Sequence, residues 1–349
     1  PSHSEQYLGT WNSVGTWRKM AQSRNQSERD PVILYGRAAA WGLPSLSPAC
    51  TAVEAYLRLA DIPLAVERCA SNTASPSGVL PAAEAGDDLF SADEGVTDEW
   101  AVAEAVVTHL KRARVDLDDA LPAQHRGASL AFFALLEKTL VPATVFFTWV
   151  DDSSWWQHSR PAYGEGMPFP VSYIVPFAQR RSITSQFMKT DKEAIVRRAS
   201  SAYEALAAQL AGSKGPYIFG SSPSSLDAFV FSHLLYHRNA PVCLELQREL
   251  SKHTALLEYV QRLHSELFST PAPPPPVDNT PRSKKQQQQA GKAAGEASSK
   301  ARTEKEERLK RRGRVWLGFA AAAVAAYVLL SGRYIDIDGD FFYEDEEED

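Results

Sequence analysis

The sequence has few cysteines and lacks the short motifs that mark common classes of enzyme. Its 349 residues include three cysteines, Cys50, Cys69 and Cys243, which are too few and too scattered for a disulfide framework or a cysteine-based zinc site. It has no phosphate loop and no dinucleotide fingerprint. One histidine pair, His233 and His237, lacks the intervening glutamate of a zinc protease. We therefore expect no metal site, a reducing compartment, and a structural histidine pair with one member exposed.

The charge of the chain is distributed unevenly. Residues 1–270 carry 24 basic and 29 acidic side chains, residues 271–314 carry 12 and 5, and residues 333–349 carry 1 and 9. Residues 315–332 carry none. This pattern predicts a globular part, a basic linker, a membrane anchor and an acidic tail.

Residues 315–332 read VWLGFAAAAVAAYVLLSG. A helix of that length spans about 27 Å, the core of a thin bilayer. The basic flank lies before the span, which predicts a cytosolic globular part, and it consists of Arg308, Lys310, Arg311, Arg312 and Arg314. We expect a C-terminal tail anchor rather than a buried alanine-rich helix. Short, mildly hydrophobic spans with basic flanks favour the mitochondrial outer membrane, and a plastid outer membrane stays open.

The anchor and the segments beside it offer contacts of different kinds. Gly318, Ala322 and Ala326 recur every four residues, so another helix or a barrel wall could approach closely, although abundant alanine explains the pattern equally well. The basic run at 308–314 favours anionic lipid headgroups over nucleic acid. The acidic tail, 333–349, would project into the intermembrane space, either to contact a basic partner or precursor or as a solubilising end.

The globular part divides into two expected domains after a polar N-terminal arm, 1–30, which shows no signal peptide. In the first domain, 31–120, strand patterns cover 32–35 and 64–69, Ser47 and Pro48 open a helix between them, and a further helix covers 98–111. This order, with a Val-Leu-Pro turn at Pro81, is typical of a thioredoxin-like domain, where that proline is usually cis.

The second expected domain, 121–270, is helical throughout. Apolar residues recur at helical spacing over 128–140 and 191–210, and three prolines interrupt 168–176. Ser224 and Asp227 form a capping box that opens an apolar helix. A proline run then ends the domain, and the linker 271–314 has too few apolar residues to fold alone, so we expect it to be disordered.

Five motifs, in order along the chain, resemble the metaxin family. They are Trp41-Gly-Leu-Pro44, Gly127-Ala-Ser-Leu-Ala-Phe-Phe-Ala-Leu-Leu-Glu-Lys138, Phe147-Thr-Trp-Val-Asp151, Pro168-Phe-Pro170, and Tyr217-Ile-Phe-Gly220 running into Ser225-Leu-Asp-Ala-Phe-Val230. The resemblance covers about residues 31–270. It implies an α+β, glutathione-transferase-like fold, with a thioredoxin-like domain before an all-helical one. It also implies a cytosol-facing subunit of the machinery that sorts and assembles β-barrel proteins in the mitochondrial outer membrane.

The transferase-like fold raises the question of catalysis. Such enzymes keep a hydroxyl or thiol at the start of the first helix, where Ser47 stands, but a helix cap accounts for this serine. They hold the γ-glutamyl group with an acidic residue and a serine at the start of a later helix, where counting along the chain places Val102 and Ala103. An apolar pair cannot bind an ammonium or carboxylate group. We therefore expect no enzyme activity, no catalytic residues and no cofactor.

Exposed aromatic residues are the expected binding groups. Trp155 and Trp156 are adjacent, so at least one should face outward as a partner anchor, and Trp41 lies on the loop beside the ancestral active site. The expected partners are a β-barrel insertase, other subunits of an outer-membrane complex, precursor proteins and membrane lipids, without nucleic acid. Two alternatives remain open: a membrane-tethered glutathione transferase, and an adaptor that links the outer membrane to another complex or to transport machinery.

Overall fold

The computed structural model describes residues 31–270, apart from residues 94, 186, 188 and 189. The predicted arm 1–30, linker 271–314, span 315–332 and tail 333–349 lie outside the described residues. So do the predicted small residues of the span, Gly318, Ala322 and Ala326, and the basic flank Arg308, Lys310, Arg311, Arg312 and Arg314.

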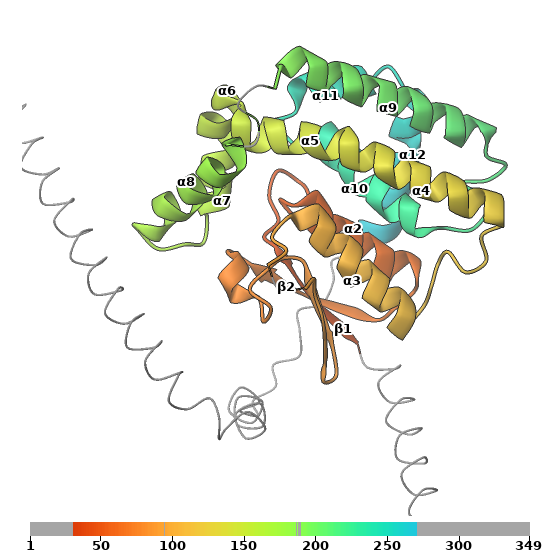
Figure 1. The fold of residues 1–349 in the computed structure, drawn as a ribbon, viewed down its shortest axis with the longest axis horizontal. Coiled ribbons are helices and arrows are strands. Elements are labelled where there is room, and N and C mark those ends of the chain that lie inside the picture. Colours follow the sequence, from red (N-terminus) through yellow and green to blue (C-terminus); the bar gives the residue numbers. More distant parts are fainter. Residues whose placement is uncertain (1–30, 94, 186, 188–189, 271–349) are drawn as a thin grey trace, which may run out of the picture. The chain divides into compact units, whose positions relative to one another are not determined.

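The first part of the described chain is a four-stranded sheet with helices α2 and α3. The strands lie in the order β2-β1-β3-β4, with β1 parallel to β2 and antiparallel to β3. Helix α2 connects β1 to β2, and α3 packs beside it (Figure 1). These elements confirm the expected thioredoxin-like order, and the Leu80–Pro81 peptide bond before β3 is cis. Their bounds are β1 Val32–Arg37, α2 Pro48–Leu59, β2 Leu64–Cys69, β3 Ala82–Ala85, β4 Asp88–Phe90 and α3 Glu99–Ala113, with a short 3₁₀ turn Asn72–Ala74.

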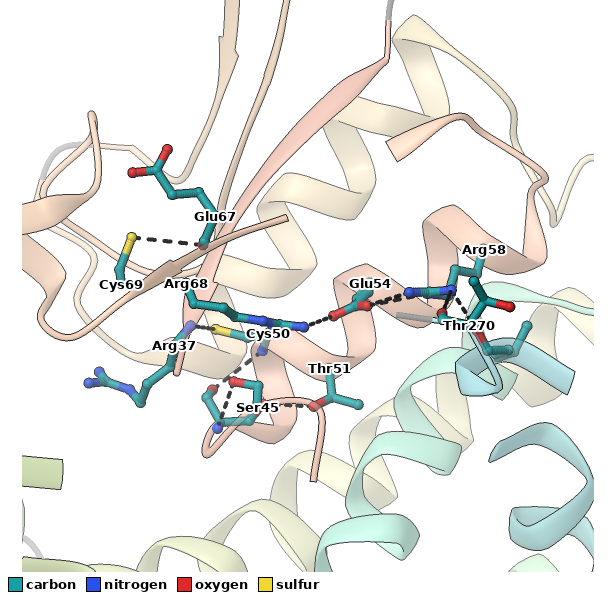
Figure 2. Close-up of polar contacts among 12 residues, drawn as sticks. Arg37, Ser45, Cys50, Thr51, Glu54, Arg58, Glu67, Arg68, Cys69 and Thr270 are labelled. Carbon is teal, nitrogen blue, oxygen red and sulfur yellow. Dashed lines mark hydrogen bonds and ion pairs between the residues drawn. The ribbon is translucent and has the colours of Figure 1, made fainter. Parts of the chain in front are cut away.

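Helix α2 begins at a serine cap and is buried along most of its length. The Ser47 hydroxyl accepts a hydrogen bond from the Cys50 backbone N–H, and Pro48 occupies the first turn. Inside α2, Glu54 is 1% exposed and pairs with Arg58 at 2.9 Å and with Arg68 of β2 at 2.8 Å, as Figure 2 shows. Arg58 also donates to the carbonyl oxygen of Thr270. A buried carboxylate thereby ties α2 to the sheet and to the end of the helical part.

The second part is helical and packs on α2 through α10. Thirteen consecutive residues of α10, from Ser225 to His237, are buried, and Figure 1 shows this helix inside the bundle. The helices are α4 Ala123–Lys138, α5 Leu140–Val145, α6 Asp152–Ser154, α7 Arg160–Gly164, α8 Val171–Thr184, α9 Lys192–Gly212, α10 Ser225–Asn239, α11 Leu244–Leu250 and α12 Thr254–Phe268. Two π-helical turns, η2 Phe146–Val150 and η3 Trp155–Ser159, flank α6.

Helices α4 and α5 are nearly continuous, with a distortion at Thr139 (φ −125°). Pro142 explains this distortion, because proline removes a helix N–H and its ring clashes with the carbonyl group four residues earlier. The stretch Ala123–Val150 contains an 18-residue window with a mean hydropathy of 1.7, enough by length and composition to cross a membrane. The core helices of soluble proteins meet the same criterion, so this stretch gives little support for a second span.

The start of α10 carries a complete capping box. Ser224 and Asp227 satisfy each other's backbone N–H groups, as their spacing predicts. Asp227 is 0% exposed and also accepts hydrogen bonds from the Ile218 N–H and the Tyr259 hydroxyl, both at 2.9 Å. Burial raises the pKa of Asp227, while the surrounding donors oppose the shift. One carboxylate therefore connects the 217–220 turn, α10 and α12.

We predict that Asp227→Ala destabilises the chain by about 3 kcal/mol, because it leaves several buried donors without an acceptor. Asp191→Ala is the matched control, since Asp191 caps α9 through two backbone N–H groups at the surface and its loss should cost about 1 kcal/mol. Urea unfolding followed by tryptophan fluorescence measures both. Equal losses for the two variants would contradict a special role for Asp227.

Candidate functional site

The predicted tryptophan anchors have different environments. Trp155 is 0% exposed and packs against Trp149 and Phe177, so the prediction that it is an exposed anchor is wrong. Trp156 is 52% exposed. Trp41 is half-buried against Tyr236, in a left-handed backbone conformation with φ 56°. The adjacent pair diverges because successive helical side chains point in different directions.

Trp41 and Trp156 line the same groove, which has a volume of about 930 Å³. One wall comes from the loop after β1, and the other comes from η3, α7 and the start of α8. The lining joins aromatic and charged groups, among them Trp41, Trp156, Tyr173, His158, Arg160 and Glu165. Aromatic and arginine side chains at the edge of an open concavity are the groups that most often anchor a protein partner.

Arg160 is the charged group that the sequence analysis missed. Its guanidinium carbon lies 4.3 Å from the ring centre of Tyr173 and 5.5 Å from that of Trp156. None of the ion pairs among the described residues involves Arg160. A guanidinium held by stacking keeps its in-plane N–H groups available for a carboxylate or another acceptor. No local sequence signal distinguishes this arginine, because the stacking depends on contacts between η3, α7 and α8.

Gly164 allows α7 and α8 to approach closely enough to build the groove. A Cβ atom at this position would lie 2.7 Å from the Ser172 carbonyl oxygen. That carbonyl is the one that the ring nitrogen of Pro176, four residues later, cannot hydrogen-bond. The three prolines of 168–176 therefore do not prevent a helix: α8 begins after the second and contains the third.

The ancestral catalytic position is occupied by side chains of the chain itself. The Ser47 hydroxyl donates to Glu99 at 2.5 Å, and Glu99 pairs with Arg37 at 2.7 Å. Arg37 is 4% exposed, and its backbone N–H donates to the Cys50 sulfur (Figure 2). Burial alone would lower the pKa of Arg37, but the nearby Glu99 carboxylate raises it by more. The pKa is therefore above its ordinary value, and the guanidinium stays charged. A carboxylate bound to Ser47 disfavours a second anion there, such as a thiolate.

Helix α3 begins where the predicted helix 98–111 begins, but its first acidic residue is not where counting along the chain placed the glutathione-binding pair. Its first residue is Glu99, so Val102 and Ala103 lie within the helix, and both are 0% exposed. Glu99 therefore supplies the acidic residue that a transferase keeps at the start of this helix. The next residue is Trp100 instead of serine, and the Glu99 carboxylate already pairs with Arg37. A neighbouring cavity beside Glu99 and His233 has a volume of only about 60 Å³. That space is far below the size of ordinary ligand pockets.

Cys50 is also poorly suited to nucleophilic chemistry. The side chain is fully buried, and this burial raises the pKa of the thiol to about 11. Because the thiolate is the reactive form, Cys50 stays protonated and unreactive near neutral pH. Among the described residues, no group of three or more histidine, cysteine or acidic side chains could hold a metal ion.

The histidine pair of α10 is buried as a whole, so the prediction that one member is exposed is wrong. Both His233 Nδ1 and His237 Nε2 lie within 3.0 Å of the Thr144 hydroxyl, which donates to the Leu140 carbonyl oxygen. Tyr203 lies 2.8 Å from His237 Nδ1. Both rings can make these contacts in their neutral form, in which each donates one N–H to the Thr144 oxygen. Burial lowers the pKa of His233 to about 3 and also lowers that of His237.

Comparisons with known proteins give a coherent set of relatives. Residues 50–180 match a family model described as an outer mitochondrial membrane transport complex protein, and residues 199–263 match the glutathione S-transferase C-terminal domain. Metaxin-1 of Sus scrofa is 30% identical over 321 residues, which cover 86% of this chain and 90% of that protein. The Arabidopsis thaliana mitochondrial outer membrane import complex protein METAXIN is 29% identical, covering 92% of this chain and 98% of that protein.

Other matches are shorter or concern the fold. Metaxin-1 of Macaca fascicularis is 33% identical over 58% of this chain, and the chain spans 64% of the length of that relative. Among solved structures, a glutathione S-transferase III in its apo form is 18% identical with a TM-score of 0.41, covering 70% of this chain and 100% of that one. A glutathione transferase from Phanerochaete chrysosporium is 16% identical with a TM-score of 0.47, covering 68% and 97%.

We predict that the chain does not bind glutathione, because Glu99 and Arg37 occupy the position beside Ser47. Isothermal titration should show no binding up to millimolar glutathione, with a catalytically active glutathione transferase as the positive control. Ser47→Ala should lower stability by about 1 kcal/mol through loss of the cap and should leave the titration unchanged. A submillimolar affinity would contradict this prediction.

We predict that the chain loses stability as the pH falls below about 6.5. The pKa values of His233 and His237 are lower in the folded chain than in the unfolded chain, so the unfolded chain binds more protons in this range. Each histidine contributes a slope of up to about 1.4 kcal/mol per pH unit. Urea unfolding between pH 7 and 5 measures it. His237→Gln should roughly halve this slope, and an unchanged slope would show that other groups cause it.

Proposed function

This chain belongs to the metaxin family, and we propose that it acts as a non-enzymatic, tail-anchored subunit of a protein import complex in the mitochondrial outer membrane. The observation that carries the proposal is the match to pig metaxin-1 over 90% of that protein. The description of the family model at residues 50–180, and the printed name of the Arabidopsis relative, place such proteins in an outer-membrane transport or import complex.

The contacts of the transferase-like part support binding rather than catalysis. Ser47 is committed to a helix cap and to Glu99, and the thiol of Cys50 is buried and protonated. The groove between Trp41 and Trp156 instead presents a half-buried and an exposed aromatic side chain with a stacked arginine. We propose that this groove receives another subunit of the complex, such as a β-barrel insertase, or a precursor on its way to it.

The sequence supports the proposed position of the chain in the membrane. The uncharged segment 315–332 follows a strongly basic stretch and precedes an acidic one, residues 333–349. By the positive-inside rule this arrangement puts the globular part in the cytosol and the acidic tail in the intermembrane space. The segment would then hold the groove near the cytosolic face of the complex.

We predict that Trp156→Ala lowers recovery of the partner at least about tenfold, because truncating an aromatic anchor typically costs 2 kcal/mol or more. The measurement is affinity isolation of the tagged full chain from gently solubilised mitochondria, with quantitative mass spectrometry. Leu244→Ala is the matched control, since Leu244 on α11 is also 52% exposed but does not line the groove.

The identity of the partners separates the alternatives. A β-barrel insertase that is lost with Trp156→Ala and retained with Leu244→Ala supports the proposal. Motor adaptors or another large membrane complex in its place would support an adaptor function instead. Full recovery of the insertase with Trp156→Ala would show that the groove is not the docking site.

A further inference from the structure

Helix α8 is apolar around its first two turns and yet exposed. Among its fourteen residues, Pro176 alone is buried. Large apolar side chains before and within these turns are exposed: Phe169 by 83%, Ile174 by 58%, Tyr173 by 48%, Val171 by 41%, and Val175 and Phe177 by 37% each. A helix that is apolar on all sides is normally buried in a protein core or in lipid. This segment therefore needs a cover that the described residues do not supply.

The apolar side chains point in several directions. Successive residues of a helix are separated by about 100°, so Val171, Tyr173, Ile174, Val175 and Phe177 surround α8 instead of forming one stripe. Phe169 extends this surface onto the loop before the helix. In Figure 1, α7 and α8 lie apart from the bundle of α4, α5 and α9–α12, at the left of the molecule. A rigid partner covers one face of such a projection, whereas a fluid layer of acyl chains can cover every side that α7 and η2 leave exposed.

The charges beside this surface are almost all positive. Residues 155–185 contain three arginines, Arg160, Arg180 and Arg181, and a single acidic residue, Glu165. Arg180 is mostly buried and pairs with Asp152 at 2.5 Å, so its charge is already balanced. Arg181 is exposed and takes part in none of the ion pairs among the described residues. This charge complements the phosphates of anionic lipids, which attract basic residues placed close to the surface.

Polarity also changes along α8 in the order that a membrane surface requires. From Val171 to Arg181 the helix rises about 15 Å, with apolar residues first and Arg180 and Arg181 last. Side chains that insert into the headgroup and acyl boundary reach about 5–10 Å deep, so Arg181 would lie at the level of the phosphates.

We propose that the 168–177 segment docks on the cytosolic surface of an anionic bilayer, with Phe169 and Ile174 among the acyl chains and Arg181 at the headgroups. The proposal rests on the proposed function only for the presence of the outer membrane next to this domain. Docking at this second point would fix the orientation of the groove relative to the membrane, which a single span and a linker of 44 residues do not.

The experiment uses the full chain with an environment-sensitive fluorophore on a single added cysteine, at Phe169→Cys or Ile174→Cys. The three native cysteines are buried, which keeps them from competing for the label. Leu130→Cys and Leu244→Cys are matched controls on α4 and α11, because both leucines are exposed apolar residues away from α8. Vesicles of phosphatidylcholine, with and without one-fifth phosphatidylinositol, carry spin-labelled lipids that quench a probe in contact with acyl chains.

We expect quenching at positions 169 and 174 to exceed that at positions 130 and 244 about threefold, and to depend on phosphatidylinositol. With the label at 174, Arg181→Gln should lower the ratio of docked to undocked chain about fivefold, which corresponds to about 1 kcal/mol per basic residue near the surface. Arg198→Gln, on the exposed side of α9, should leave it unchanged.

Equal quenching at all four positions would overturn the proposal. Crosslinking of position 169 to a protein in intact mitochondria, without quenching in vesicles, would assign this surface to a protein partner instead. The vesicles contain no other protein, so this result does not depend on whether the chain binds an insertase. The isolation experiment in turn does not depend on docking to lipid.

Discussion

The burial of α10 is the constraint on which the rest of the described fold depends. A helix surrounded on all sides must find a partner for each of its polar side chains, because a buried polar group without one is costly. Asp227 finds donors in the 217–220 turn and in α12, and the two histidines reach Thr144 and Tyr203 on α5 and α9. Because α2 covers another side of α10, the sheet and the helical bundle share one hydrophobic core. Because burial lowers the pKa of both histidines, the stability of this packing depends on pH.

That shared core also places the start of α2 against the rest of the molecule, where a transferase would keep its thiol site. Here Glu99 accepts both an ion pair from the buried guanidinium of Arg37 and a hydrogen bond from the Ser47 hydroxyl. Breaking this set of contacts for a ligand would leave Arg37 charged and buried without its partner, which is strongly unfavourable. The same contacts that stabilise the fold therefore oppose the ancestral chemistry. The groove of Trp41 and Trp156 offers a binding surface outside this set of contacts.

Local signals in the sequence were sufficient for most of the described elements. Ser47 with Pro48, and Ser224 with Asp227, mark helix starts because a cap needs only neighbouring residues. Properties that depend on distant contacts were not predictable. The start of α3 lies within one residue of the predicted 98, but the pairing of its first residue, Glu99, with Arg37 of β1 has no local signature. Trp155 and Trp156 are equivalent in sequence, and only the packing of Trp155 into a cluster with Trp149 and Tyr163 decides which one is buried. The apolar run of α8 resembles a core helix until the structure shows that nothing described here covers it.

Several unbalanced features of the described chain lie together around α7 and α8. Core groups such as Glu54, Asp227 and His237 have their partners, although each is buried. Around α7 and α8, by contrast, Arg160 has no carboxylate, the buried Ser159 hydroxyl has no hydrogen-bond partner among the described residues, and Phe169 is almost fully exposed. Selection for stability alone would favour polar residues on such a surface, since exposed apolar patches promote aggregation. An unpaired arginine beside several exposed apolar side chains is what we expect of a surface that completes its contacts outside the molecule. In the proposed arrangement, those contacts are a protein in the groove and the bilayer beneath α8.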